Sequence, residues 1–185
     1  MKDAPAANAL IIDVAIPSAT WRRRMPGVIG LARETVAAVM TDAGVADAEV
    51  SLVLGDDAAV RTLNRRWRGK NAPTNVLSFP TGERRMLGDV VLAFETVVRE
   101  AKEQGKPLAH HLRHLIVHGV LHLLGYDHER ERDAARMENR ERRILKRFDI
   151  PDPYHIGPSP LASPTLLLKG GGEKIYSRAR RGKHG

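Results

Sequence analysis

Between residues 107 and 124, apolar side chains recur three and four positions apart, which is the spacing of one face of an α-helix. They are Leu108, Leu112, Leu115, Ile116, Val120 and Leu123. Gly125 follows directly, and glycine is the residue that most often ends a helix. We therefore predict a helix here, and its last part is apolar apart from His118 and His122, four positions apart.

The other periodic segments define the fold class. We predict strands at 10–16, 49–55, 75–79 and 88–94, and further helices at 21–43, 57–67, 95–104 and 131–148. The last of these helices is rich in charged residues, and we expect it to be exposed. A strand–helix–strand–helix order, followed by two strands and then helices, predicts an α+β fold. We expect a single domain with a small mixed four-stranded sheet packed with about five helices.

The composition changes after the segment PDPY at 151–154. We place the domain at residues 1–156 and interpret 157–185 as a flexible basic tail, because it combines glycine, proline and serine with basic residues. From Lys169 onward there are six basic residues and one acid, so this part carries +5 of the net charge of +8. The residues before it therefore carry only +3, and the basic composition is a weak sign of a polyanionic partner for the domain.

Several classes of protein are excluded by what the sequence lacks. The chain has no cysteine, so disulfides, thiolate zinc sites and a cysteine nucleophile are excluded. No apolar stretch approaches the ~20 residues that cross a bilayer, so we expect no membrane association. Asp3 and Asp13 interrupt the N-terminal residues, which do not resemble a signal peptide. We therefore expect a soluble, cytoplasmic protein.

The segment HGVLHLLGYDH at 118–128 has the spacing of a metal site. His118 and His122 lie on one face of the predicted helix, within reach of one ion. Gly125 can adopt a positive φ and turn the chain back, so that His128 arrives from the loop as a third ligand. Three neutral imidazoles leave a tetrahedral zinc with one open position, where bound water becomes acidic enough to react near neutral pH.

The same histidines could instead form a polar stripe, because His110, His114, His118 and His122 follow one another at intervals of four. That stripe drifts by about 40° per step, so His110 diverges from the metal face. Burying a polar side chain in so apolar a helix is costly unless the side chain has a binding partner, so two histidines there favour a metal site. We assign His110, His111 and His114 to the surface or to the surroundings of the ligands.

The spacing of the three histidines and the glycine equals that of the metzincin pattern H-E-x-x-H-x-x-G-x-x-H, but Gly119 stands in place of the glutamate. Because that glutamate is the general base of the metalloproteases, its absence argues against proteolysis by that mechanism. We also expect a glycine there to open space beside the metal for a bulky substrate. Asp127 either orients a ligand imidazole or serves only the loop; both interpretations stay open.

A basic loop precedes the third predicted strand. Arg65, Arg66, Arg68 and Lys70 surround Trp67 within LNRRWRGKNAPTNVLSFP. Arginines with an aromatic side chain suit phosphates and unpaired bases, although solvated charges at a helix end are commoner. Together, RTLNRRWRGKNAPTNVLSFP, LGDVVLAFETVVREA and HGVLHLLGYDH resemble the YbeY family of rRNA-maturation endoribonucleases, over about residues 50–155.

The resemblance implies one zinc ion at His118, His122 and His128, and a functional arginine at Arg68. We assign Arg68 and His118 to catalysis. It also implies cleavage of single-stranded RNA in 16S rRNA 3′-end maturation and ribosome quality control, with the small ribosomal subunit or assembly factors as partners. Asn71 departs from the family, which commonly has an acid there. Water and a ribose 2′-OH both remain possible nucleophiles.

Two other functions are weighed against this one. A zinc peptidase or other small-molecule hydrolase would use the same metal, but Gly119 and the arginine loop count against it. A ribosome-assembly factor with a structural metal would need no open coordination position, so a fourth protein ligand would favour it.

Overall fold

The computed structural model describes residues 9–154. Its strands are β1 (Leu10–Ala15), β2 (Ala48–Gly55), β3 (Val76–Pro80) and β4 (Met86–Ala93). Its helices are α1 (Ala19–Arg24), α2 (Val28–Ala43), α3 (Asp57–Arg68), α4 (Phe94–Glu103), α5 (Leu108–Leu123) and α6 (Glu131–Lys146). The predicted α+β fold with a four-stranded mixed sheet is confirmed. The proposed boundary at residue 156 and the tail at 157–185 lie outside the described residues.

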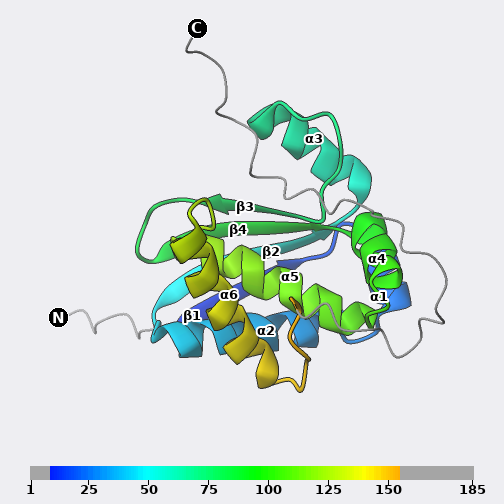
Figure 1. Ribbon diagram of the computed structural model, residues 1–185. Helices are drawn as coiled ribbons and strands as arrows, with labels where there is room; N and C mark the ends of the chain where they lie inside the picture. Colours follow the sequence, from blue (N-terminus) through cyan, green and yellow to red (C-terminus); the bar gives the residue numbers. More distant parts are fainter. Residues whose placement is uncertain (1–8, 155–185) are drawn as a thin grey trace, which may run out of the picture.

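The sheet has the order β1-β2-β4-β3, in which β1, β2 and β4 are parallel and β3 is the antiparallel edge strand. Helices α2 and α5 cover one face, and α6 packs on the outside of α5, whereas α3 lies on the opposite face against β3 and β4 (Figure 1). α5 is therefore the central helix, and most of its apolar residues are buried. This position explains why its sequence is apolar on nearly all sides.

The predicted helix at 21–43 is wrong in one respect, because the chain forms two helices there. α1 ends at Arg24 and α2 begins at Val28. Pro26 cannot donate a backbone hydrogen bond and disfavours a helical conformation at Met25, which has φ −138° and ψ 77°. Gly27 then adopts a φ of +87° and is the N-cap residue of α2.

The expectation that the last helix is exposed holds for one of its faces and is wrong for the other. α6 buries Met137, Glu141, Ile144 and Leu145, and it packs against α5 and α2. These residues recur at intervals of four, three and one, so the helical period that indicates a buried face was present in the sequence. The high charge of the other face masked it. Among the described residues, no helix has the length and apolar character needed to cross a membrane.

Candidate metal centre

The three histidines predicted as ligands lie together. His118 and His122 come from the last turns of α5, and His128 comes from the loop that follows. One nitrogen from each ring can be chosen so that all three lie within 4.8 Å of one another, and all three residues are half-buried. The cluster could therefore hold a metal ion.

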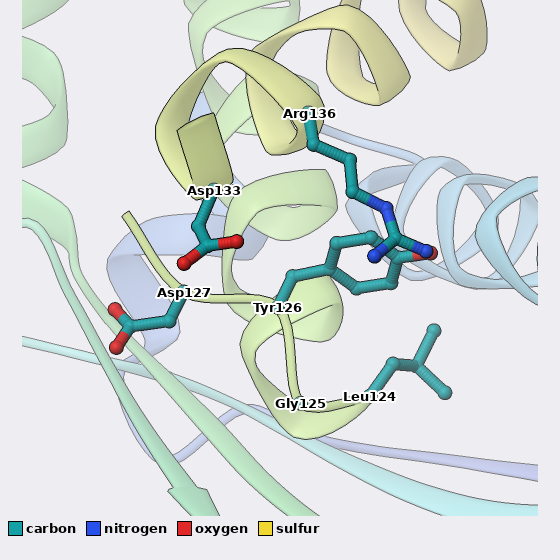
Figure 2. A pocket seen from close by; sticks show the side chains of 6 residues that line it. All are labelled: Leu124, Gly125, Tyr126, Asp127, Asp133 and Arg136. Atoms are coloured by element: carbon teal, nitrogen blue, oxygen red, sulfur yellow. The ribbon is translucent and has the colours of Figure 1, made fainter. Parts of the chain in front are cut away.

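The loop between α5 and α6 turns as the sequence predicts. Gly125 has a φ of +85°, and its amide donates to the carbonyl of His122. Tyr126 then points away from Asp127 and lies beside Arg136, whose guanidinium is 5.5 Å from the ring centroid (Figure 2). Arg140 also contacts the Tyr126 hydroxyl, and its Nε donates to Asp42 at 2.6 Å. α6 thus fixes the loop that carries His128.

The spacing of the His118 and His122 nitrogens fits a tetrahedral ion. Two nitrogens at about 2.0–2.1 Å from a tetrahedral zinc lie roughly 3.3 Å apart. Nε2 of His118 and Nε2 of His122 are 3.1 Å apart. The His128 ring centroid lies 5.5 Å from that of His118 and 5.0 Å from that of His122. Three imidazoles are one of the donor sets that hold zinc in open, catalytic sites.

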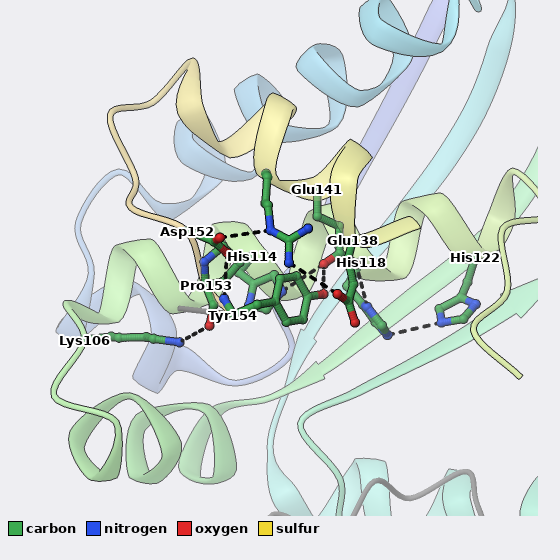
Figure 3. Close-up of polar contacts among 10 residues, drawn as sticks. Lys106, His114, His118, His122, Glu138, Glu141, Asp152, Pro153 and Tyr154 are labelled. Atoms are coloured by element: carbon green, nitrogen blue, oxygen red, sulfur yellow. Dashed lines mark hydrogen bonds and ion pairs between the residues drawn. The ribbon is translucent and has the colours of Figure 1, made fainter. Parts of the chain in front are cut away.

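Glu141 of α6 holds the His118 imidazole in position, a role that no pattern in the sequence indicated. Its Oε1 accepts a hydrogen bond from His118 Nδ1 at 2.8 Å (Figure 3). Since an ionised carboxylate can only accept, Nδ1 carries the proton and the lone pair of Nε2 is available to a metal ion. Oε2 accepts from His114 Nε2 at 3.1 Å and from the Tyr154 hydroxyl. Glu141 therefore connects α5, α6 and the end of the described chain.

The electrostatics of this cluster favour a charged Glu141 and a neutral His122. Burial by itself would raise the pKa of Glu141, but hydrogen bonds from His114 and His118 outweigh it and hold the pKa well below its ordinary value. Burial, with the neighbouring His118 and His128, lowers the pKa of His122 to about 4. At neutral pH His122 is thus unprotonated, the state that binds metal.

Replacing Glu141 by glutamine should weaken metal binding by about 10- to 100-fold, because an uncharged amide raises the basicity of His118 less than a carboxylate does. The measurement is a zinc dissociation constant by chelator competition, with circular dichroism to check the fold. Glu138→Gln is the matched control, since Glu138 lies one turn earlier on α6 and pairs with Arg142 at the surface. Equal zinc affinity in the two variants would contradict the role of Glu141.

The expectation that Gly119 opens space for a bulky substrate is wrong. A Cβ built on Gly119 would lie 2.6 Å from Val90 Cγ1, 3.2 Å from Ser78 Oγ and 3.3 Å from Val76 Cγ2. The space is taken by the sheet, and Ser78 Oγ donates to the Gly119 carbonyl at 3.1 Å. A glutamate at this position would collide with β3 and β4, so the close approach of α5 to the sheet requires glycine.

Gly119→Ala should therefore lower the free energy of unfolding by about 1–3 kcal/mol through overpacking, despite the higher helix propensity of alanine. Gly30→Ala is the control, because Gly30 is also helical but a Cβ there meets nothing within 4 Å. That variant should gain up to about 1 kcal/mol. Denaturant unfolding of both proteins tests the difference, and equal stability would show that the sheet yields to the added methyl group.

A cleft of about 360 Å³ leads to the histidines. His118, His122 and Asp127 line one side, Ser78 and Pro80 of β3 line another, and Arg68 reaches it from the end of α3; Val76, Gly125 and Tyr126 complete the lining. Arg68 precedes Gly69, which ends α3 in the left-handed conformation. The fold thus brings Arg68 to the same cleft as two of the candidate ligands, although 50 residues separate it from His118 in the sequence.

The remaining candidate residues have structural partners. His111 is buried and Nε2 contacts Glu100 at 2.9 Å, whereas His114 shares Glu141 with His118. Asp127 Oδ1 accepts a hydrogen bond from the backbone N–H of His128 at 2.7 Å, so Asp127 stabilises the loop. The carboxylate that orients a candidate ligand imidazole is that of Glu141, which binds His118. Asn71 Oδ1 accepts a hydrogen bond from Arg61 Nε at 2.9 Å. An amide at position 71, where the family commonly has an acid, therefore still provides an acceptor for Arg61.

Comparison with known proteins agrees with this geometry. The family model described as Endoribonuclease YbeY matches residues 20–149. A relative of that name from Rhodopseudomonas palustris (strain BisA53) is 57% identical over 127 residues, covering 64% of this chain and 74% of its own. One from Nitrobacter hamburgensis is 50% identical over 154 residues, covering 77% and 80%.

A solved structure supports the fold alone. The solution structure of TM1509 from Thermotoga maritima is 22% identical, has a TM-score of 0.51, and covers 75% of this chain and 92% of its own. The chain is thus an α+β domain in which the central helix and the following loop gather three histidines that could hold a metal ion, next to a cleft that Arg68 lines. The family model and the relatives show that the chain belongs to the Endoribonuclease YbeY family.

Proposed function

We propose that this protein is a zinc-dependent endoribonuclease that cleaves single-stranded RNA in 16S rRNA 3′-end maturation and ribosome quality control. The observation that carries the proposal is the shared cleft of Arg68, His118 and His122. It combines a metal-binding cluster with a side chain suited to phosphate. The relatives of this protein are named endoribonucleases. The proposed partners are the small ribosomal subunit or its assembly factors, in the cytoplasm.

His118, His122 and His128 would hold the zinc ion through their imidazole nitrogens. When bound, zinc supplies a Lewis acid that polarises a phosphoryl oxygen and acidifies water. Glu141 keeps the Nδ1 proton on His118 and so directs Nε2 toward the ion. Because Glu141 is fully buried, it holds this orientation without competition from solvent.

Arg68 would bind the scissile phosphate. Its guanidinium offers a planar pair of N–H donors that matches two phosphate oxygens, and it remains charged at any physiological pH. Donors placed where negative charge grows stabilise the transition state more than the bound substrate. Two groups in the cleft would thus bind the phosphate: the histidine cluster with its metal, and the arginine at the end of α3.

The structure also bears on the two rivals. A peptidase of the metzincin type needs a glutamate where Gly119 stands, and packing against Val90 leaves no room for one. A structural metal would have a fourth protein ligand. Among residues 9–154, the metal-capable group contains the three histidines and no fourth histidine, cysteine or carboxylate. An open position next to a cleft favours catalysis.

One assay tests the proposal. Zinc-loaded protein, chelated protein and zinc-loaded Arg68→Ala protein are incubated with one RNA that has paired and unpaired segments. The zinc-loaded wild type should cut the unpaired segments, and the other two samples should not. A peptide mixture is the control substrate. Cleavage of peptides, or RNA cleavage that survives both chelation and the Arg68 substitution, would overturn the proposed function.

A further inference from the structure

Trp67 is an exposed aromatic side chain beside the cleft. It is 63% exposed, more than the other large hydrophobic residues that the structure describes as exposed, Ile11 and Met86. Its indole meets the Phe79 ring edge-on, with centroids 6.3 Å apart and an angle of 62°. Phe79 packs in turn against the small core cluster between α3 and the sheet. The indole is therefore oriented by a neighbour while much of its surface faces solvent.

The surroundings of Trp67 are strongly basic. Residues 58–82 contain five basic side chains, Arg61, Arg65, Arg66, Arg68 and Lys70, and no acidic one. The Arg66 guanidinium lies over the indole, 5.4 Å from the ring centroid. Basic side chains at the end of a helix do stabilise its dipole, but that effect needs no exposed indole. An exposed aromatic ring inside a cationic surface is the combination that binds unpaired nucleotides.

The position of Trp67 relative to the cleft follows from the edge strand β3. Alternate residues of a strand face opposite sides of the sheet. Ser78 and Pro80 line the cleft on the α5 side, whereas Phe79 faces α3 on the other side. Because Trp67 contacts Phe79 and the next residue, Arg68, reaches the cleft, the end of α3 extends around the edge of the sheet.

We propose that the Trp67 indole is a stacking platform for one unpaired base of the RNA, on a nucleotide that flanks the phosphate bound in the cleft. The proposal rests on the proposed ribonuclease function and adds a specificity-determining residue to it. A base in a duplex is already stacked on its neighbours, so the platform accepts only single strands. The Arg66 guanidinium, which lies over the indole, would bind a phosphate of the same RNA strand.

Intrinsic fluorescence provides a direct test. The chain has two tryptophans, and Trp21 is fully buried in the core, with its Nε1 donating to the Gly55 carbonyl. Quenching by added RNA therefore reports on Trp67. The full chain, kept in chelator so that the RNA stays intact, is titrated with a short single-stranded RNA, the same RNA in a duplex, and a strand of abasic residues. Only the first should quench.

Substitutions separate stacking from charge. Trp67→Ala should weaken binding of the single strand about 10-fold with an unchanged salt dependence, and Trp67→Phe, which keeps an aromatic face, should retain most of the affinity. Arg66→Ala should instead reduce the slope of log K against log salt by about 1. Met86→Ala removes another exposed apolar side chain, at the start of β4, and should change neither quantity.

Each result has one meaning. Unchanged affinity in Trp67→Ala, or equal quenching by the abasic strand or the duplex, would overturn the platform even if the enzyme cleaves RNA. Quenching by the single strand without any RNA cleavage in the zinc-loaded wild type would instead reject the proposed function and keep the platform. If Trp67→Ala fails to fold by circular dichroism, the comparison of normal and abasic strands on the wild-type protein decides.

Discussion

Replacing His122 by alanine should remove most of the bound zinc and abolish RNA cleavage. The wild-type protein should carry about one zinc ion per chain, held by three imidazoles. Loss of one of three ligands should weaken affinity by more than about 100-fold, the upper range for loss of a residue that only supports a ligand. Metal analysis after dialysis and a cleavage assay measure the two effects.

His110→Ala is the matched control, because His110 lies on the same helix and lines a separate pocket with Lys106 and Asp149. That variant should keep its zinc and its activity. A His122→Ala protein with a full complement of zinc would refute the assignment of the ligands, and so would equal loss of zinc in both variants.

Replacing Arg68 by alanine should abolish cleavage while leaving zinc content and fold intact. A donor aimed at developing charge is worth about 10²–10³ in turnover, whereas its contribution to the α3 dipole is below about 1 kcal/mol. Arg68→Lys should recover only part of the activity, because an ammonium group cannot form the planar pair of hydrogen bonds. Steady-state kinetics with zinc-loaded proteins are the measurement.

Arg65→Ala serves as the control for Arg68, since Arg65 is also exposed in the last turn of α3 but does not line the cleft. It should lose some RNA affinity at low salt and keep its turnover. Equal turnover in Arg68→Ala and the wild type would show that Arg68 is only a solvated surface charge.

The periodic pattern of residues determined most of the fold. The central helix, the glycine that ends it and the four strands are local properties, because apolar spacing and turn chemistry act over a few residues. The grouping of His118, His122 and His128 is also local, since one helix turn and one positive φ at Gly125 suffice. Pro26 also indicates a helix break at this point, but the apolar pattern on both sides of it led to the prediction of one continuous helix.

Tertiary packing decided the rest. Glu141 lies 23 residues from His118, and only the docking of α6 on α5 brings the two side chains together and buries the carboxylate. The reason for glycine at position 119 lies in the distance between α5 and the sheet, which no spacing along the chain encodes. Arg68 lines the same cleft as His118 and His122 because β3 is an edge strand and the end of α3 extends around it. Contacts between distant segments depend on how whole elements pack, so the sequence indicated the candidate ligands and the fold determined which residues surround them.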